Sequence, residues 1–294
     1  MFCEINYTII IPHKNTPELL RRCLDSIPCR EDIQIIVVDD NSMLEDIDLK
    51  TFSGLNGSCV KIFFGKEGKG AGHARNMGLK EAVGNWVLFA DADDYFSDGF
   101  LQHLDKYKDS NYDLIFFRSA RESTKDEEKK SIISKYDKLI MQERNIEAYI
   151  YTASVAWGKM IKLSLIKENN ILFDETMVAN DKMFSIKVSH CAKDIHFDDQ
   201  QIYTYVPSNS FLTRLKTNEA NFNRFDVYVR INSFLTSISK KKYRINLIVP
   251  LKRLMDVQNM TYFWSGIRLM KQHNISLLAE LFLFLMSLPK KIKK

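Results

Sequence analysis

The sequence predicts an α/β fold in which helices cover both faces of a mostly parallel β-sheet. Over the first hundred residues, short apolar runs alternate with amphipathic helix candidates, which is the pattern of successive strand and helix units. The apolar runs are nearly continuous, as expected for strands that are buried on both faces. With 294 residues and 45% hydrophobic content, the chain can bury a full core and form one large or two small domains.

The strands are expected where these apolar runs occur. Most of the runs are rich in isoleucine, valine and phenylalanine, which favour extended backbone. In chain order we expect strands at residues 7–11, 34–40, 59–64, 86–94 and 113–117, and two shorter strands at residues 195–197 and 202–206. The charge-mixed run at residues 121–131 is predicted to be a solvated loop.

The first helix has the clearest boundaries. Thr16 stands at the N-cap position and Pro17 at the first helical position, where the missing N–H of proline is not needed. Its apolar face is formed by Leu19, Leu20, Cys23, Leu24 and Ile27. We expect a second helix at residues 73–83, after the glycine-rich stretch "GKEGKGAG", and a third at residues 181–193.

A change of composition near residue 210 predicts two parts of the chain. Beyond residue 209 the sequence is basic, aromatic and helical in pattern, and it has no glycine until Gly266. We therefore expect an α/β domain at residues 1–210, with a division into halves near residue 115. A basic helical region is expected at residues 211–294.

Charge and cysteine content indicate where the protein works. The net charge of +5 is mild, and no nucleic-acid partner is predicted. The five cysteines show no C-x-x-C spacing, which favours reduced thiols in the cytoplasm, and the amino terminus lacks the basic start of a secretory signal.

The carboxyl-terminal region suggests an anionic surface as a partner. It ends in the lysine-rich "PKKIKK", and the apolar run at residues 277–288 has about half of the ~20 residues that cross a bilayer. Such a segment suits the interface of a membrane with anionic lipids. The alternative is a helical cap that packs on the first domain.

Aspartates close two of the expected strands. Asp39 and Asp40 end one, and Asp91, Asp93 and Asp94 end another. The carboxyl ends of strands in an open parallel sheet form a ligand crevice, so these acids are expected to share one site. If the backbone is extended, Asp91 and Asp93 point to one side, where repulsion favours a neutralising cation. Oxygen ligands favour Mn²⁺ or Mg²⁺ with a phosphorylated ligand, whereas the alternative is that such aspartates only cap the next turn.

The glycine-rich stretch does not match the common phosphate-binding motifs. A Walker A pattern from Gly65 requires lysine where Ala71 stands, and G-x-G-x-x-G fails at His73 and Arg75. An EF-hand loop from Asp91 would require glycine at Phe96. These failures argue against P-loop, dinucleotide-binding and EF-hand proteins.

Four stretches in fixed order resemble the nucleotide-binding half of glycosyltransferase family 2, which has the GT-A fold. They are "IIIPHKN", "IIVVDDNS", "GHARNMGL" and "FADADD". Residues 156–184 are similar to the stretch that leads to an acid pair at the acceptor in bacterial polysaccharide-building members. The resemblance covers residues 5–210 and implies a nucleotide-binding half at about 1–115 and an acceptor half at 116–210.

The resemblance also implies roles for individual residues. It assigns to the donor nucleotide Pro12, Asp39, Asp40, Arg75, Asn76 and Asp91. Asp93, with Asp91 beside it, would hold Mn²⁺ or Mg²⁺ on the diphosphate. The family's acid pair falls on Asn180 and Asp181, so the first acid is replaced by an amide and Asp181 is expected to be the general base. Trp157 is a candidate for stacking on the acceptor sugar.

The function implied is inverting transfer of a hexose from a UDP-sugar, with UDP-glucose favoured over UDP-galactose. The expected acceptor is a lipid-linked saccharide such as GlcNAc- or GalNAc-diphosphoundecaprenol, and a β-linkage would form in O-antigen or capsule synthesis. The enzyme would lie on the inner face of the bacterial cell membrane. Two alternatives are a weakly active membrane-associated scaffold, which Asn180 favours, and a sugar-nucleotide pyrophosphorylase, which "PHKNTPELL" disfavours because it lacks glycine.

Overall fold

The structure is a computed structural model that describes residues 4–43, 60–122, 145–207, 217–256 and 260–287. The chain divides into two compact units. The first comprises Met1–Glu175 with Asn180–Ser208, and the second comprises Thr176–Ala179 with Asn209–Lys294.

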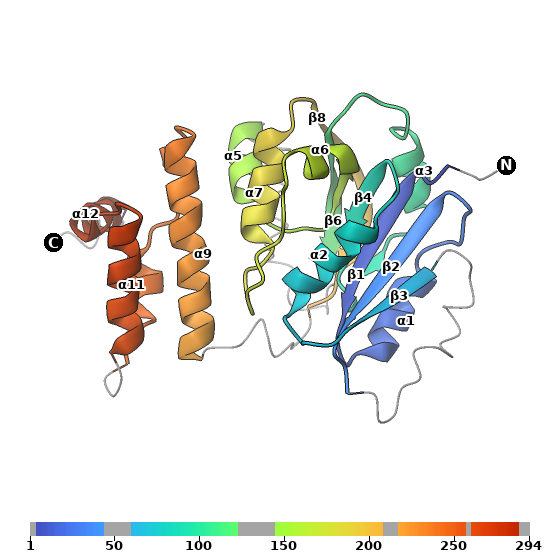
Figure 1. Cartoon of the computed structure of the whole chain (residues 1–294). Helices are drawn as coiled ribbons and strands as arrows, with labels where there is room; N and C mark the ends of the chain where they lie inside the picture. Colours follow the sequence, from blue (N-terminus) through green and yellow to red (C-terminus); the bar gives the residue numbers. More distant parts are fainter. Residues whose placement is uncertain (1–3, 44–59, 123–144, 208–216, 257–259, 288–294) are drawn as a thin grey trace. The chain divides into compact units, whose positions relative to one another are not determined.

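The first unit is built on a single sheet, which contains eight strands among the described residues (Figure 1). Their order is β3-β2-β1-β4-β7-β6-β8-β5. The strands are β1 (Tyr7–His13), β2 (Ile33–Asp40), β3 (Val60–Gly65), β4 (Trp86–Phe89), β5 (Tyr95–Phe96), β6 (Leu114–Arg121), β7 (Lys159–Lys162) and β8 (Ile195–Tyr205). The strands β3, β2, β1 and β4 are parallel neighbours, as are β6 and β8, whereas β7 is antiparallel to β4 and β6, and β5 to β8. The predicted α/β class with a mostly parallel sheet is confirmed.

Two expectations about the strands are wrong. Residues 195–197 and 202–206 belong to one strand, β8, because the intervening residues continue beside β6 with a register shift near Arg118. The strand expected at residues 86–94 ends at Phe89. Its acids lie in a turn in which the Asp94 N–H donates to the Asp91 carbonyl at 3.1 Å, so the backbone there is not extended.

Helices flank the sheet. In the described part of the first unit they are α1 (Pro17–Asp25), α2 (Ala71–Glu81), α3 (Phe100–Asp105), α5 (Ile146–Thr152), α6 (Leu163–Glu168) and α7 (Lys182–Cys191). The helix α1 starts at Pro17 as predicted. The helix α2 starts two residues before the predicted position, because Gly70 adopts a positive φ of 91° and its carbonyl accepts the Ala74 N–H at 3.1 Å.

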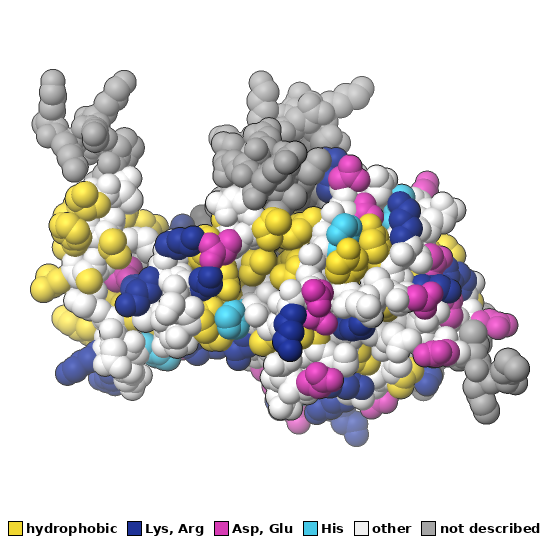
Figure 2. Space-filling model, turned by 90° about the horizontal axis from the view of Figure 1, so that it is seen from above, with side chains coloured by type: hydrophobic (Ala, Val, Ile, Leu, Met, Phe, Trp, Pro, Cys, Tyr) yellow, Lys and Arg dark blue, Asp and Glu magenta, His cyan; other side chains and the backbone are white. Residues whose placement is uncertain are grey.

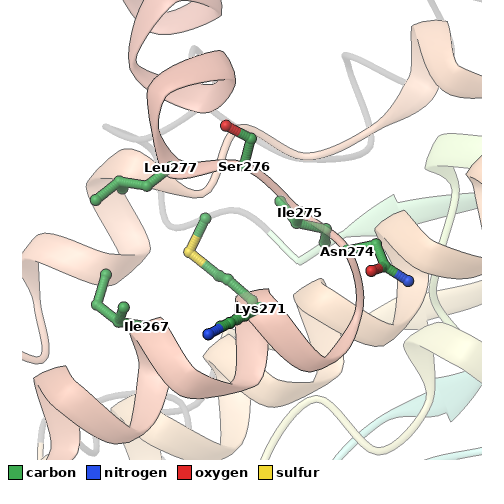
Figure 3. A pocket seen from close by; sticks show the side chains of 7 residues that line it. Ile267, Lys271, Asn274, Ile275, Ser276 and Leu277 are labelled. Carbon is green, nitrogen blue, oxygen red and sulfur yellow. The ribbon is translucent and has the colours of Figure 1, made fainter.

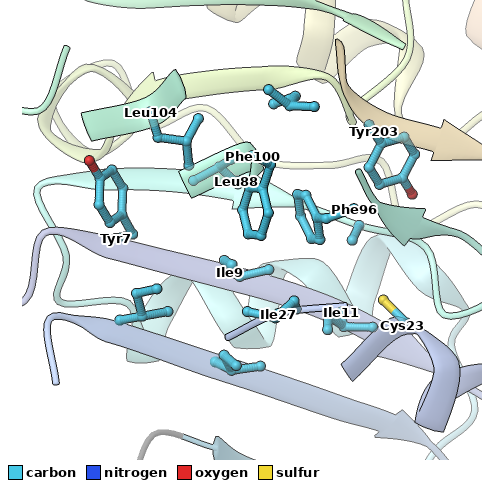
Figure 4. Close-up of a cluster of buried hydrophobic side chains, with 14 of the residues drawn as sticks. Tyr7, Ile9, Ile11, Cys23, Ile27, Leu88, Phe96, Phe100, Leu104 and Tyr203 are labelled. Atoms are coloured by element: carbon cyan, nitrogen blue, oxygen red, sulfur yellow. The ribbon is translucent and has the colours of Figure 1, made fainter. Parts of the chain in front are cut away.

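Alternation along β1 divides the core into two layers. Ile9 and Ile11 point to the layer that α1 and α3 cover, where they meet Cys23 and Phe100 (Figure 4). Ile10 points to the opposite layer, where α2, α6 and α7 contribute apolar side chains. Burial on both faces explains why the strand sequences are continuously apolar.

The second unit is helical. Its described elements are α9 (Asn218–Ser237), a 3₁₀ turn η4 (Lys241–Tyr243), α10 (Ile248–Lys252), α11 (Thr261–Gln272) and α12 (Leu277–Ser287). Its core is formed by Phe225, Val229, Leu247, Leu251, Leu254 and Met270. Among the described residues, each helix is too short or too polar to span a bilayer.

Candidate active site

The carboxyl ends of β1, β2 and β4 lie side by side at one edge of the sheet. Pro12 is buried in β1, opposite Val38 of β2. Asp39 and Asp40 end β2, and the turn that holds Asp91 follows β4. The fold therefore brings the predicted donor-side residues of three strands to one edge, which is where open α/β sheets bind ligands.

Asp39 faces inward and supports this edge. Its carboxylate accepts hydrogen bonds from the Ser42 N–H at 2.9 Å and hydroxyl at 2.5 Å. Because the Thr16 N–H donates to His13 Nε2 at 3.1 Å, the ring proton is assigned to Nδ1, which donates to Asp39 at 2.8 Å. Burial raises the pKa of Asp39, but the hydrogen bonds from His13 and Ser42 outweigh it and hold the pKa below its usual range. His13, to which the sequence assigns no role, thus orients Asp39.

Asp40 joins the end of β2 to the glycine-rich segment. Its carboxylate accepts the Gly70 N–H at 2.9 Å and lies 3.5 Å from Lys14 Nζ. Gly70 immediately precedes α2, so this contact sets the start of the helix that carries Arg75 and Asn76.

Arg75 connects the two halves of the site. It is 5% exposed, and its Nη1 donates to Asn180 Oδ1 at 2.9 Å. Its Nη2 forms an ion pair with Asp91, and the guanidinium lies 5.3 Å from the centre of the Phe173 ring. A planar guanidinium with several donors can hold both partners at once. The donor-side acid and the residue next to Asp181 are therefore held together by one side chain.

Asn76 is engaged by backbone rather than directed to open space. Its amide nitrogen donates to the Phe173 carbonyl at 3.0 Å, and its oxygen accepts the Phe173 N–H at 2.8 Å. The nitrogen is also 3.3 Å from Glu175 Oε1. We therefore propose that Asn76 acts on the nucleotide site indirectly, by fixing the segment beside Arg75.

The three acids after β4 are not equivalent. The ligand oxygens of Asp91, Asp93 and Asp94 lie within 4.8 Å of one another, although the backbone is a turn. Asp94 is buried and accepts the Tyr203 hydroxyl at 2.7 Å and the Val206 N–H at 2.8 Å. Burial, and then the charge of Asp91, raise the pKa of Asp94 to about 8. Asp94 is thus held by the core, and the two partly exposed acids remain as candidate ligands.

This cluster fits a divalent cation. Carboxylate oxygens are the ligands that Mn²⁺ and Mg²⁺ prefer, and the three acids place their ligand oxygens within reach of one ion. Arg22 supports the turn from α1, because its Nη2 donates to the Asp93 carbonyl. Asp93 and Asp91 would hold the ion, while Asp94 is committed to Tyr203 and the backbone of Val206.

Asp181 lies at the N-cap position of α7 and keeps a partly exposed surface. Burial raises its pKa, while the positive charges of Lys182 and Arg75 lower it and the negative charge of Asp91 raises it again. A carboxylate whose pKa is raised toward neutrality is a better proton acceptor at working pH. The position and environment of Asp181 suit the general base that the sequence predicts.

Trp157 forms part of an aromatic stack. Its ring lies 5.4 Å from that of Tyr203 and 6.0 Å from that of Tyr205, with interplanar angles of 15° and 17°. The indole is only partly buried. We propose that its remaining surface meets the acceptor, with the tyrosines as its support.

Substitution of Gly72 in α2 is expected to damage the site. A Cβ at this position would lie 2.0 Å from the Asp174 carbonyl oxygen and 3.0 Å from Asn180 Cβ. Gly72→Ala should therefore displace the segment before Asp181, lower the free energy of unfolding by about 1–3 kcal/mol and weaken UDP binding. Gly78→Ala is the matched control on the same helix, since the nearest atoms to its Cβ belong to the side chain of Ile10, at 2.5 Å, rather than to backbone.

Gly78→Ala should lower stability but keep nucleotide affinity once the protein is folded. Thermal denaturation and calorimetric titration with UDP measure both quantities. If both variants bound UDP with the same affinity, the close packing of Gly72 against Asp174 would not be needed for nucleotide binding, and this prediction would be contradicted.

The sheet and the acid-bearing turn after β4 have the arrangement of the GT-A fold, which the solved structures described below share. Residues 8–164, more than half of the chain, match the model of glycosyl transferase family 2, and the chain belongs to this family.

Several curated relatives are similar over most of this chain. The glycosyltransferase GlyA of Streptococcus pneumoniae is 25% identical over 74% of this chain and 33% of its own length. The poly(ribitol-phosphate) beta-glucosyltransferase of Bacillus spizizenii is 28% identical over 68% and 32%. TarP of Staphylococcus aureus, a poly(ribitol-phosphate) beta-N-acetylglucosaminyltransferase, is 27% identical over 79% and 72%. The chain thus spans about a third of the length of the first two.

Solved structures share the fold. A fragment of S. aureus TarS in complex with UDP-GlcNAc has a TM-score of 0.65 at 21% identity, over 88% of this chain and 73% of that one. A mannosyltransferase of Pyrobaculum calidifontis, in complex with GDP-Man and Mn²⁺, has a TM-score of 0.53 at 16% identity, over 97% and 80%.

Proposed function

We propose that this protein is a metal-dependent inverting hexosyltransferase that uses a UDP-sugar and acts on a lipid-linked saccharide. The observation that carries the proposal is the position of Arg75, which contacts Asp91 of the acid cluster and Asn180, the neighbour of Asp181. A transferase requires a site for the diphosphate leaving group next to a base for the acceptor. Relatives that add glucose or N-acetylglucosamine, and a neighbour bound to UDP-GlcNAc, support a UDP-hexose donor.

In this mechanism Asp181 accepts the proton of the acceptor hydroxyl. The oxygen forms a bond to the anomeric carbon on the face opposite the diphosphate, and the bond between that carbon and the diphosphate oxygen breaks, so that UDP leaves with the electron pair. A single displacement inverts the configuration and converts an α-linked donor into a β-linked product. A divalent ion, when bound by Asp93 and Asp91, supplies Lewis-acid stabilisation of the leaving group. Arg75 holds Asp91 on the donor side and Asn180 on the acceptor side in a fixed position relative to each other.

Donor and acceptor screening tests this proposal. UDP-glucose, UDP-galactose and UDP-GlcNAc are supplied with Mn²⁺ and a synthetic lipid-diphosphate-linked GlcNAc or GalNAc, and product mass and UDP release are recorded. We expect UDP-glucose to be preferred over UDP-galactose. A poly(ribitol-phosphate) acceptor forms a second arm, because the B. spizizenii relative and TarP carry this substrate in their names. If the protein neither hydrolyses any of these donors nor transfers a sugar from them, the proposal is overturned and a scaffold is favoured.

The second unit offers a surface for membrane attachment. The helix α12 has only Glu280 buried, where it is paired with Arg244 and accepts the Leu247 N–H at 3.1 Å. Exposed apolar side chains of α12 are Leu277, Leu278, Leu281, Phe282, Leu283, Leu285 and Met286. Figure 2 shows hydrophobic side chains gathered at the end of the view where α12 lies.

A pocket of about 410 Å³ lies beside this helix (Figure 3). Its lining combines the apolar Ile267, Met270 and Ile275 with the cation of Lys271. Apolar surface next to positive charge suits anionic lipids. The lysines predicted to contribute at residues 290–294 lie outside the described residues. We propose that the enzyme binds in this way to the inner face of the bacterial cell membrane, where an O-antigen or capsule precursor would be exposed.

Charge placed on α12 is expected to abolish vesicle binding. The variant Leu278→Glu/Phe282→Glu should remain at the bottom of a flotation gradient with phosphatidylglycerol vesicles, whereas the wild type should float. The reason is that the two apolar side chains can no longer be buried in the membrane interface. Val83→Glu, which changes an exposed apolar residue of the first unit, is the control and should float. Flotation of the α12 variant at the wild-type level would refute the role of this helix.

A further inference from the structure

Lys159 is a buried lysine that the proposed reaction does not use. It lies in β7, between β4 and β6, and is 2% exposed. Its Nζ donates to the carbonyl oxygens of Ala153, at 3.3 Å, and Val155, and lies 5.5 Å from the centre of the Phe116 ring. An apolar side chain would fill this position without the cost of removing an ammonium group from water. Its presence in the core therefore calls for a role beyond packing.

The carbonyls that Lys159 holds belong to a segment that also carries the start of α7. The Val155 carbonyl accepts a second hydrogen bond, from the Ser185 hydroxyl at 2.8 Å. The Lys182 Nζ donates to the Ser154 hydroxyl at 3.0 Å. Lys182 and Ser185 form the first turn of α7, directly after Asp181. Residues 153–155 are thus clamped between Lys159 on one side and the turn next to the proposed base on the other.

Lys159 also interacts electrostatically with Asp181, the proposed base. Burial lowers the pKa of Lys159 to about 7, and the negative charge of Asp181 raises it. This interaction is mutual, so a positive Lys159 favours the ionised form of Asp181. The other charged groups that act on Asp181 are Lys182 and Arg75, which favour ionisation, and Asp91, which opposes it. Lys159 can therefore favour the ionised form of Asp181 when it is protonated, in addition to Lys182 and Arg75.

We propose that Lys159 is a positioning residue for Asp181: it fixes the segment 153–155 on which the first turn of α7 rests, and in its protonated form its charge acts on the base. The inference rests on the role of Asp181 in the proposed function. Lys159 touches neither donor nor acceptor in this account. Its effect reaches the reaction through the orientation and the ionisation of Asp181.

Lys162 offers a matched control on the same strand. Its Nζ also donates to a carbonyl, that of Ser110 at 3.3 Å, and also lies 5.5 Å from the centre of an aromatic ring, that of Trp86. Neither Ser110 nor Trp86 belongs to α7. Lys159→Met and Lys162→Met therefore remove the same chemical group from one strand, at a buried position and at a partly exposed one, and methionine keeps a long unbranched side chain at both.

The first measurement does not depend on activity. In Lys159→Met, amide hydrogen exchange of residues 182–186 should become faster than in the wild type, because the clamp on residues 153–155 is lost. In Lys162→Met, exchange of this turn should be unchanged. Unchanged protection in Lys159→Met would overturn the clamp, whether or not the protein transfers sugar.

The second measurement is steady-state kinetics over pH. In Lys159→Met, kcat should fall by roughly 10- to 100-fold with the KM for donor unchanged, since small misplacements of a reacting group carry losses of this order. The acidic limb of the kcat profile should move to higher pH, because loss of a positive neighbour raises the pKa of Asp181. A packing role alone would lower the Tm and leave the limb in place. A profile equal to that of Lys162→Met would overturn the inference, whereas absence of transfer by the wild type would instead refute the proposed function.

Discussion

Asp181→Asn is expected to lower kcat by about 10²–10⁴-fold, the usual contribution of a positioned proton acceptor. The asparagine keeps the shape of the side chain at the N-cap of α7 but cannot accept a proton from the acceptor hydroxyl. Affinity for the UDP-sugar should stay close to that of the wild type, because the donor-side contacts of Asp40, Arg75 and the acid cluster remain. Single-turnover rates and titration with UDP measure the two effects separately.

The pH profile of the wild type provides an independent check on Asp181. Burial raises the pKa of this carboxyl, and the base is active only when ionised, so the rate should fall as pH falls through that raised pKa. The acidic limb should therefore lie above the ordinary range of aspartate, near 3.9. Asp98→Asn, at an exposed position, is the control for loss of one carboxylate. Full turnover by Asp181→Asn would rule out this residue as the base.

Asp93→Asn is expected to abolish Mn²⁺-dependent binding of UDP. The acids after β4 place ligand oxygens within 4.8 Å of one another, and loss of one charged ligand removes much of the attraction for a hard cation. Titration of the protein with UDP, in the presence and absence of Mn²⁺, measures this directly. In the wild type Mn²⁺ should increase the affinity, and in the variant it should not. Activity should fall in parallel.

Asp94→Asn is the instructive comparison for Asp93. Its carboxylate accepts hydrogen bonds from Tyr203 and the Val206 N–H, and an amide can replace only part of this pattern. The expected loss is about 1–3 kcal/mol in the free energy of unfolding, with Mn²⁺-dependent UDP binding retained. If Asp94→Asn lost the metal effect and Asp93→Asn kept it, the assignment of ligand and structural acid would have to be exchanged.

Much of the fold could be predicted because local sequence decides it. The strand β1 is apolar at every position from Tyr7 to Ile11 except Thr8, and Pro17 after Thr16 marks the start of α1; both were found as expected. The turn at Asp91 was missed, because the apolar run before it continues to the acids and nothing nearby shows where the extended backbone ends. The sequence also did not indicate that β8 is one continuous strand. Polar residues separate its two apolar ends, and only pairing with β6 keeps the strand extended.

The sequence predicted which residues belong to the candidate site but not how they contact one another. The stretches at Asp91 and at Asp181 could be found from the family resemblance, but their connection through Arg75 depends on α2 lying between them. Asp39 carries the same motif signal as Asp40, yet it faces inward to His13 and Ser42. Lys159 gave no signal, because a lysine in a mixed sequence is usually exposed and its burial follows from the central position of β7.

The sequence by itself determined the α/β class, the family and the acids at or just after the ends of two strands, because periodicity and motif order are properties of neighbouring residues. The tertiary structure alone decided which acid is committed to the core, which acids stay partly exposed, and which charges act on Asp181. These distinctions depend on burial and on distances between side chains that are far apart along the chain. Electrostatic energies change steeply with both, so they emerge only when the sheet and its helices are assembled.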